Sequence, residues 1–163
     1  MRTLLILRHA KSSWDNSNLA DHARPLNERG KTDAPRMGRL LQTEDLVPDL
    51  IIASSAERAL KTAELVALNC DYENEIKVTR QFYLADPETY LEVLAGVDER
   101  YQRVMVVGHN PGMEELVEEL TGESVRMATA ALAHVQFNIA RWQDLTPGTT
   151  AKLQAVWLPK ELG

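Results

Sequence analysis

The chain has 163 residues, of which 44% are apolar and 26% charged. These proportions are typical of an ordinary globular protein and exclude a wholly disordered chain, a collagen-like repeat and a membrane bundle. The 18 basic and 24 acidic side chains give a formal charge of −6. This charge argues against a general nucleic-acid binder, because such proteins gain affinity by neutralising phosphates.

The cysteine content and the N-terminal residues exclude further classes of protein. Cys70 is the only cysteine, so neither an internal disulfide nor a thiolate zinc cluster can form. The first apolar run, Leu4–Leu7, is too short for a signal-peptide core or a membrane span. No linker or internal repeat interrupts the chain. We therefore expect one domain over residues 1–163, located in the cytoplasm and binding neither membrane nor nucleic acid.

Charge is unevenly distributed along the chain. Residues 1–64 carry 10 basic and 9 acidic side chains, whereas residues 65–163 carry 8 and 15. An anion-binding site is therefore expected to take its arginines from the first part.

The chain alternates apolar runs with segments of helical periodicity, which predicts an α/β sheet covered by helices on both faces. A polar loop over residues 9–27 separates the first strand from the first helix. The tail predicts two antiparallel strands, over about 131–140 and 150–158. The other expected strands are Thr3–Leu7, Leu50–Ala53, Ile76–Thr79 and Arg103–Val107, and the helices are Thr32–Gln42, 55–69, Pro87–Leu94 and one from Asn110 to Gly122.

Helix starts are predicted from capping residues. Glycine at position 122 is expected to end the last helix. The expected N-caps are Thr32, with Pro35 in the first turn; Ser54, in a capping box with Glu57; and Asn110, before Pro111.

Polar side chains follow three of the predicted strands, at the point where each strand ends. In a doubly wound sheet, ligands bind outside the carboxyl ends of the parallel strands, so these three loops are expected to share one crevice. The groups are Arg8-His9 after the first strand, Ser54, Ser55 and Arg58 after the second, and Gly108-His109-Asn110 after the fourth.

This set of residue types suits phosphate chemistry. Guanidinium groups match phosphate oxygens, and helix N-termini favour anions. A neutral imidazole can attack phosphorus, and a second imidazole, if protonated, can hold the oxyanion. Each group alone is also compatible with a solvated loop or an ordinary helix start. Their coincidence at three strand ends favours a phosphate site.

Four segments resemble motifs of the histidine phosphatase superfamily, which includes cofactor-dependent phosphoglycerate mutase. The run Leu7–Ala10 is similar to its Arg-His-Gly signature, and Ser54–Ala63 to its Ser-Ser-x-x-x-Arg-Ala-x-Gln-Thr-Ala motif. Gly108–Pro111 resembles the motif around its second histidine, and Arg24–Gly30 its Arg-Pro-Leu-Thr-x-x-Gly segment. The four occur in the family's order. The resemblance implies a three-layer α/β/α sandwich with a mostly parallel central sheet.

The short chain and the run Arg8–Trp14 look most similar to the SixA-like phosphohistidine phosphatase branch. The resemblance implies that His9 is the nucleophile and is phosphorylated in mid-cycle. It also implies that Arg8 and Arg58 clamp the phosphoryl oxygens and that His109 completes the pocket.

Two further residues are implied more weakly. Ser12 lies where relatives often place another phosphate contact, and Asn110 stands beside the second histidine, where we expect it to cap the helix. One departure is mild: Ala10 replaces the glycine of the signature, and its small side chain still permits close approach of a phosphate.

A second departure concerns the proton donor that mutases and many related phosphatases place before the second histidine motif. The corresponding region, residues 81–88, offers Asp86 and Glu88 as candidate general acids. Asp86 before Pro87 is also typical of a helix N-cap, and Glu88 of a first-turn charge.

The chemistry of the leaving group gives this departure a meaning. An alkoxide needs a proton from the enzyme, whereas an imidazole, with a pKa of about 6.5, can take one from solvent near neutral pH. A site without an acid should therefore favour phosphoramidates such as phosphohistidine over alkyl phosphates.

No metal-ligand or nucleotide-binding spacing occurs, so no cofactor is expected. The function favoured is hydrolysis of phosphohistidine or a phosphomonoester, with a histidine-containing phosphotransfer protein in a signalling relay as partner. A phosphatase of sugar or nucleotide phosphates is the first alternative, and a non-catalytic phosphate or phosphoprotein binder is the second. A mutase is less favoured, because the chain is short and lacks the acid.

Overall fold

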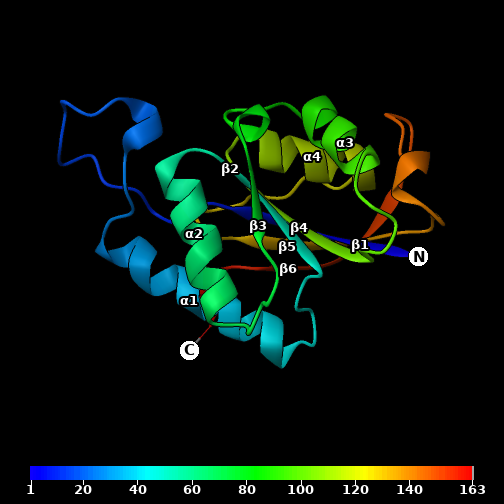
Figure 1. Ribbon diagram of the computed structural model, residues 1–163, viewed down its shortest axis with the longest axis horizontal. Coiled ribbons are helices and arrows are strands. Elements are labelled where there is room, and N and C mark those ends of the chain that lie inside the picture. Colours follow the sequence, from blue (N-terminus) through cyan, green and yellow to red (C-terminus); the bar gives the residue numbers. More distant parts are fainter. Residues whose placement is uncertain (163) are drawn as a thin grey trace.

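A computed structural model describes residues 1–162 and, within them, a six-stranded sheet in the order β3-β2-β4-β1-β5-β6 (Figure 1). The four strands β1 to β4 run parallel, whereas β5 is antiparallel to β1 and β6 to β5. The predicted mostly parallel sheet and antiparallel tail are thus confirmed. The strands are β1 (Arg2–Arg8), β2 (Leu50–Ser54), β3 (Ile76–Thr79), β4 (Arg103–Gly108), β5 (Leu132–Phe137) and β6 (Ala151–Trp157).

The central strands are apolar in their middle positions because both of their faces are covered. Along β1, Leu4 and Ile6 pack into one core, whereas Leu5 and Leu7 pack into the other. This division follows from the two-residue repeat of a strand, which points successive side chains to opposite faces.

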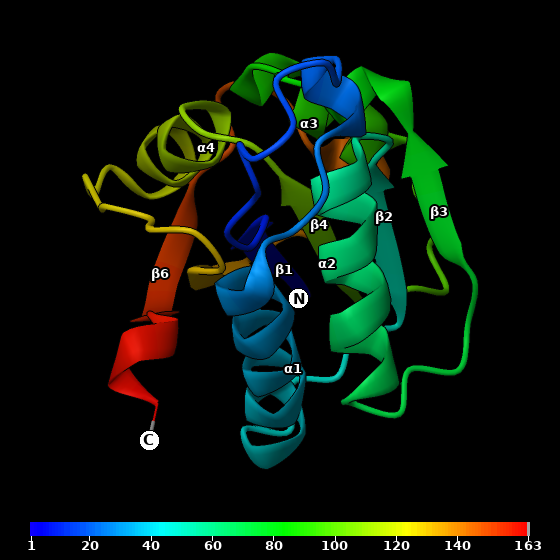
Figure 2. The same cartoon turned by 90° about the vertical axis from the view of Figure 1, so that its left-hand side faces the viewer.

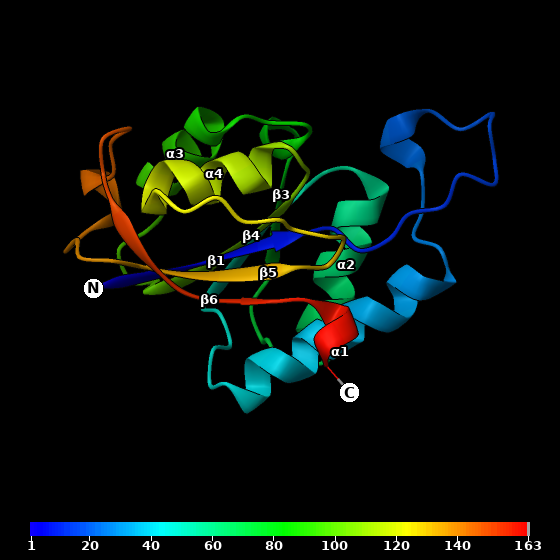
Figure 3. The same ribbon diagram turned by 180° about the vertical axis from the view of Figure 1, so that it is seen from behind.

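Two helices cover each face of the sheet (Figures 1 and 3). One pair packs into the core that holds Leu5, and the other into the core that holds Leu4. The predicted three-layer α/β/α arrangement is confirmed. The first pair is α1 (Glu28–Thr43) and α2 (Glu57–Leu68), and the second is α3 (Pro87–Ala95) and α4 (Gly112–Thr121).

The start of α1 differs from the prediction. Asn27 is the N-cap, and its side chain accepts a hydrogen bond from the Gly30 N–H. Thr32, the predicted cap, lies inside the helix and donates its hydroxyl to the Glu28 carbonyl at 3.1 Å. Pro35 therefore stands in the helix interior rather than in the first turn. The predicted start, Thr32, is four residues too late, because Asn27 caps the helix and its first residue is Glu28.

The predicted caps of α2 and α4 are also wrong. The N-caps are Ala56 and Pro111, and in the described part of the chain neither helix has a side-chain cap. Ser54 accepts the Ala56 N–H at 3.2 Å but lies in the strand, and Asn110 donates to the Met127 carbonyl at 2.9 Å. Gly122, with a φ of +76°, ends α4 as predicted.

The loop between β1 and α1 projects beyond the carboxyl end of β1 (Figure 3). It contains a short 3-10 turn, Asp21–Ala23, and an isolated β-bridge between Ser12 and Leu26. In residues 1–162, no helix combines the length and apolar character that a membrane crossing requires.

Candidate active site

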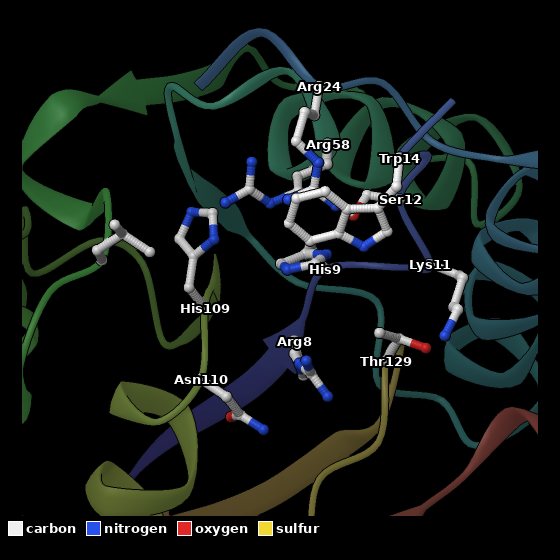
Figure 4. Close-up of a pocket in the computed structure, with 11 residues that line it drawn as sticks. Arg8, His9, Lys11, Ser12, Trp14, Arg24, Arg58, His109, Asn110 and Thr129 are labelled. Atoms are coloured by element: carbon white, nitrogen blue, oxygen red, sulfur yellow. The ribbon is translucent and has the colours of Figure 1, made fainter. Parts of the chain in front are cut away.

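The three strand-end loops meet at one edge of the sheet and surround a cavity of about 180 Å³ (Figure 4). The structure brings together all four residues expected at the centre of the site, and Ser12 and Asn110 with them. The cavity is lined by Arg8, His9, Lys11, Ser12, Trp14, Arg24, Arg58, Leu84, His109, Asn110 and Thr129.

His9 is held in a defined tautomer. Its Nδ1 lies 2.7 Å from the Ala10 carbonyl oxygen, which can only accept, so Nδ1 carries the proton and Nε2 keeps its lone pair. Burial lowers the pKa of His9 to about 4, despite the Ala10 hydrogen bond, and the positive charges of Arg58 and Arg8 add to the effect. His9 is therefore neutral at pH 7.

His109 faces His9, with 5.1 Å between the ring centroids. Its Nε2 lies 2.8 Å from the Ser54 hydroxyl. Ser54 accepts the Ala56 N–H and keeps its own proton to donate; when that proton goes to His109 Nε2, the ring proton of His109 is on Nδ1. That Nδ1 is buried and has no hydrogen-bond partner in residues 1–162.

The charge state of His109 differs from the protonated imidazole considered above. Burial lowers its pKa to about 3, and the proximity of His9 and Arg58 contributes in the same direction. His109 is therefore a neutral N–H donor at pH 7.

Two arginines of the cavity are held from behind by Asp21. The Asp21 carboxylate accepts from Arg58 Nη2 and Arg24 Nη1, at 2.9 Å each, and from the Tyr83 hydroxyl. The Asp21 backbone carbonyl accepts a second bond from Arg58, at 2.7 Å. The hydrogen bond from Tyr83 is the largest cause that holds the pKa of Asp21 well below its usual range, and those from Arg58 and Arg24 add to it. Asp21 therefore stays ionised.

Asp21 and Tyr83 were not predicted from the sequence, and Arg24 was not assigned to the site. Arg24 donates to the Ser12 hydroxyl and to the Ser13 carbonyl, and its guanidinium lies 3.2 Å from the centre of the Trp14 ring. The one cue in the sequence was the position of Asp21, three residues before Arg24, which is the first residue of the Arg24–Gly30 motif.

Arg8 lies on the other side of His9 from Arg24 and Arg58, together with Asn110 (Figure 4). Its Nη1 donates to the Met127 carbonyl at 3.0 Å, the same oxygen that accepts from Asn110. The segment before β5 thus holds this pair of side chains.

The two candidate acids do not line the cavity. Asp86 caps α3, as its position before a proline predicted, and accepts the Thr89 N–H at 3.1 Å. Glu88 lies in the first turn of the same helix. The geometry gives neither a place beside a phosphoryl group in the cavity.

Comparisons with known proteins agree with this arrangement. Residues 4–82 match the histidine phosphatase superfamily (branch 1). A solved structure of the putative phosphohistidine phosphatase SixA from Agrobacterium tumefaciens is 30% identical, with a TM-score of 0.83 over 97% of this chain and 98% of that one. The chain belongs to the histidine phosphatase superfamily. It is a hydrolase of the phosphatase type.

Other relatives of this histidine phosphatase extend the likeness over nearly the whole chain. An uncharacterised chloroplastic protein of Arabidopsis thaliana is 33% identical over 153 residues, which cover 88% of this chain and 70% of the relative. The structure of the protein histidine phosphatase SixA complexed with tungstate shares the fold, with a TM-score of 0.85 at 22% identity over 99% of both chains.

Proposed function

We propose that this phosphatase hydrolyses phosphohistidine carried on a protein, through a covalent phosphohistidine intermediate at His9. One observation carries the proposal: in the described residues, four cations and two imidazoles line the cavity and no carboxylate does. Such a site can bind and transfer a phosphoryl group but has no acid to protonate an alkoxide. An imidazole leaving group has no such need.

In the first step, His9 Nε2 forms a bond to phosphorus while the bond from phosphorus to the substrate imidazole breaks. The electron pair of the broken bond goes to the leaving nitrogen, which takes a proton from water. The low pKa of His9 supports this role, because the attacking nitrogen is unprotonated at pH 7.

In the second step, water attacks phosphorus and the bond to His9 Nε2 breaks. The electron pair returns to Nε2, the proton of the water passes to solvent, and orthophosphate leaves. The two steps together consume one water for each phosphohistidine.

The remaining side chains stabilise the transferring group. Arg8 and Arg58 offer guanidinium donors from opposite sides of His9, and Arg24 lies beside Arg58. His109 Nδ1–H, buried without an acceptor among residues 1–162, is a donor for one phosphoryl oxygen. Charge on the equatorial oxygens is what such donors stabilise in phosphoryl transfer. Ser12 and Asn110 complete the polar lining.

The rim of the cavity favours a protein substrate. Trp14 and Leu84 both line the cavity and are 75% and 59% exposed. Exposed aromatic and aliphatic side chains beside an active site are typical of protein contact surfaces. A histidine-containing phosphotransfer domain in a cytoplasmic signalling relay fits this site and is the partner we propose.

The test compares hydrolysis rates at pH 7 of a phosphohistidine-bearing phosphotransfer domain and a simple alkyl phosphate. We expect phosphohistidine to react at least about 100-fold faster, since a general acid typically contributes 10²- to 10⁴-fold. His9→Ala should abolish both reactions. Radiolabelled phosphate should be trapped on His9 after an alkaline quench, because phosphoramidates are labile in acid.

The alternatives make different predictions. Equal rates, or faster alkyl hydrolysis, would overturn the acid-free mechanism and favour a sugar or nucleotide phosphate as substrate. Tight phosphate binding without turnover of either substrate would indicate a non-catalytic binder.

A further inference from the structure

A second cavity, of about 410 Å³, adjoins the catalytic one and shares Arg8 and Asn110 with it. The segment before β5 contributes Arg126, the chain after β6 contributes Lys160, and α4 contributes Glu114. No step of the mechanism above uses Arg126, Lys160 or Glu114. The shared side chains make the two cavities neighbours along one surface.

The second cavity is positively charged in an acidic part of the chain. Among residues 1–162, three cations line it, Arg8, Arg126 and Lys160, against the single carboxylate of Glu114. Within residues 1–162, neither Arg126 nor Lys160 makes an ion pair. Both cations come from residues 65–163, which carry 8 basic and 15 acidic side chains, so they stand out against their surroundings.

Glu114 is already hydrogen-bonded to the backbone of the segment before β5. Its Oε2 accepts the Met127 N–H at 2.7 Å, and the Met127 carbonyl in turn accepts from both Arg8 and Asn110. The wall between the cavities is therefore fixed by hydrogen bonds. The cations beyond it remain available to a ligand.

We propose that the second cavity is an anion subsite. It binds a further acidic group, a carboxylate or a second phosphate, on the same substrate whose phosphoryl group enters the catalytic cavity. The subsite rests on the proposed phosphoryl site beside His9. Guanidinium and ammonium groups that lack a protein partner are the donors such an acidic group requires.

The test measures binding by titration calorimetry at low ionic strength and pH 7. The probes are phosphonoacetate, 3-phosphonopropionate and 4-phosphonobutyrate, each compared with the alkylphosphonate of the same chain length. For the spacer that reaches both cavities, we expect the added carboxylate to tighten binding about fivefold, as two partly exposed ion pairs would. The advantage should shrink at 0.5 M salt, where exposed charges are screened.

Variants assign the advantage to the second cavity. In the double variant Arg126→Gln/Lys160→Gln, the phosphonocarboxylate and the alkylphosphonate of the same chain length should bind with equal affinity, so that the ratio of the two affinities falls to one. Lys77→Gln is the matched control, because Lys77 lies on β3 at the opposite edge of the sheet from β6 and should keep the ratio (Figure 2). A thermal melt of each variant checks that it is folded.

The outcomes separate this inference from the proposed function. If alkylphosphonates bind but no carboxylate improves binding, or if the gain survives in the double variant, the subsite alone is overturned. If no phosphonate binds, the phosphoryl site fails and the subsite with it.

A second experiment identifies the molecule that carries the acidic group. It compares kcat/KM for two phosphohistidine peptides, one with Glu and one with Gln beside the phosphorylated residue. A higher kcat/KM for the Glu peptide assigns the group to a protein substrate. A gain confined to the small phosphonocarboxylates assigns it to a metabolite.

Discussion

Asp21 shows how a residue outside the cavity can set the geometry within it. Its carboxylate fixes Arg24 through one oxygen and Arg58 through the other, and Tyr83 donates to the second oxygen. Free arginine side chains sample many rotamers, and ordering them costs entropy when a ligand binds. The ionised Asp21 carboxylate orders both arginine side chains in the folded protein, so their entropy is already lost before a phosphoryl group binds. We therefore interpret Asp21 as a positioning residue.

Asp21→Asn tests this interpretation. The amide has one acceptor oxygen instead of two and no charge, so the side chain cannot accept from both arginines as the carboxylate does, and only the bond from Arg58 to the backbone carbonyl of residue 21 is unchanged. We expect kcat/KM for phosphohistidine to fall about tenfold, equivalent to about 1.4 kcal/mol, which is near the lower end for a hydrogen bond to a charged group. Tyr83→Phe removes one donor but leaves both arginine bonds, so its kcat/KM should stay within about threefold of the wild type. Equal effects of the two substitutions would contradict the proposed role.

At the scale of elements, α4 holds Arg8 through the segment before β5. Glu114, in the first turn of α4, accepts the Met127 N–H, and the carbonyl of the same residue accepts from Arg8 and Asn110. Glu115, Glu118 and Glu119 of the same helix are exposed. The acidic run on α4 thus divides into one structural carboxylate and a solvated face.

Glu114→Ala should release the Met127 peptide and with it the position of Arg8. We expect kcat/KM on a substrate with a single anionic group to fall about three- to tenfold, and the free energy of unfolding to fall by about 1–2 kcal/mol. Glu114→Gln keeps an acceptor oxygen for the Met127 N–H, so its kcat/KM and its free energy of unfolding should both stay close to those of the wild type. Glu115→Ala, on the exposed face, serves as the matched control and should resemble the wild type in rate assays and denaturant melts.

Elements could be predicted where the cue was periodic, whereas the local cues gave the end of α4 and the cap of α3 but the wrong N-caps for α1, α2 and α4. Buried runs such as Leu50–Ala53 in β2 are apolar at every position, which a sequence displays directly. The cap residues were misread because Ser54 and Asn110 have two possible partners, a helix N-terminus or a side chain or carbonyl from a distant segment. Their observed partners include His109 and Met127, and a pairing of that kind is fixed only when the sheet assembles.

At the scale of the whole molecule, parallel pairing of β1 and β2 with β4 gathers the cavity residues at one sheet edge. The strand ends could be predicted from the sequence, and with them the positions of His9 and His109. The path of residues 10–24 could not, because this loop is ordered by contacts such as Asp21 with Tyr83, 62 residues apart. The second cavity also joins segments far apart in sequence, and no local pattern marks it.

Burial of the two cavity histidines links the active site to global stability. The pKa values of His9 and His109 are lowered to about 4 and about 3, whereas an unfolded chain would have values of about 6.5. As the pH falls from 6.5 to 4, the unfolded chain takes up these protons and the folded one does not. Stability is therefore lost over that interval, with a slope of up to about 1.4 kcal/mol per pH unit for each histidine.

Denaturant unfolding between pH 4.5 and 7 measures this slope. The buffers should contain no phosphate, because an anion bound to the folded state would add stability of its own. His9→Gln and His109→Gln should each flatten the curve, since each removes one proton uptake, and the double variant should flatten it further. A wild-type curve that is level over this range would show that both histidines titrate alike in the folded and unfolded states, and that His9 is largely protonated at pH 5. The unprotonated nucleophile would then be confined to higher pH, and kcat/KM should fall below about pH 6.5 instead of staying level to about pH 4.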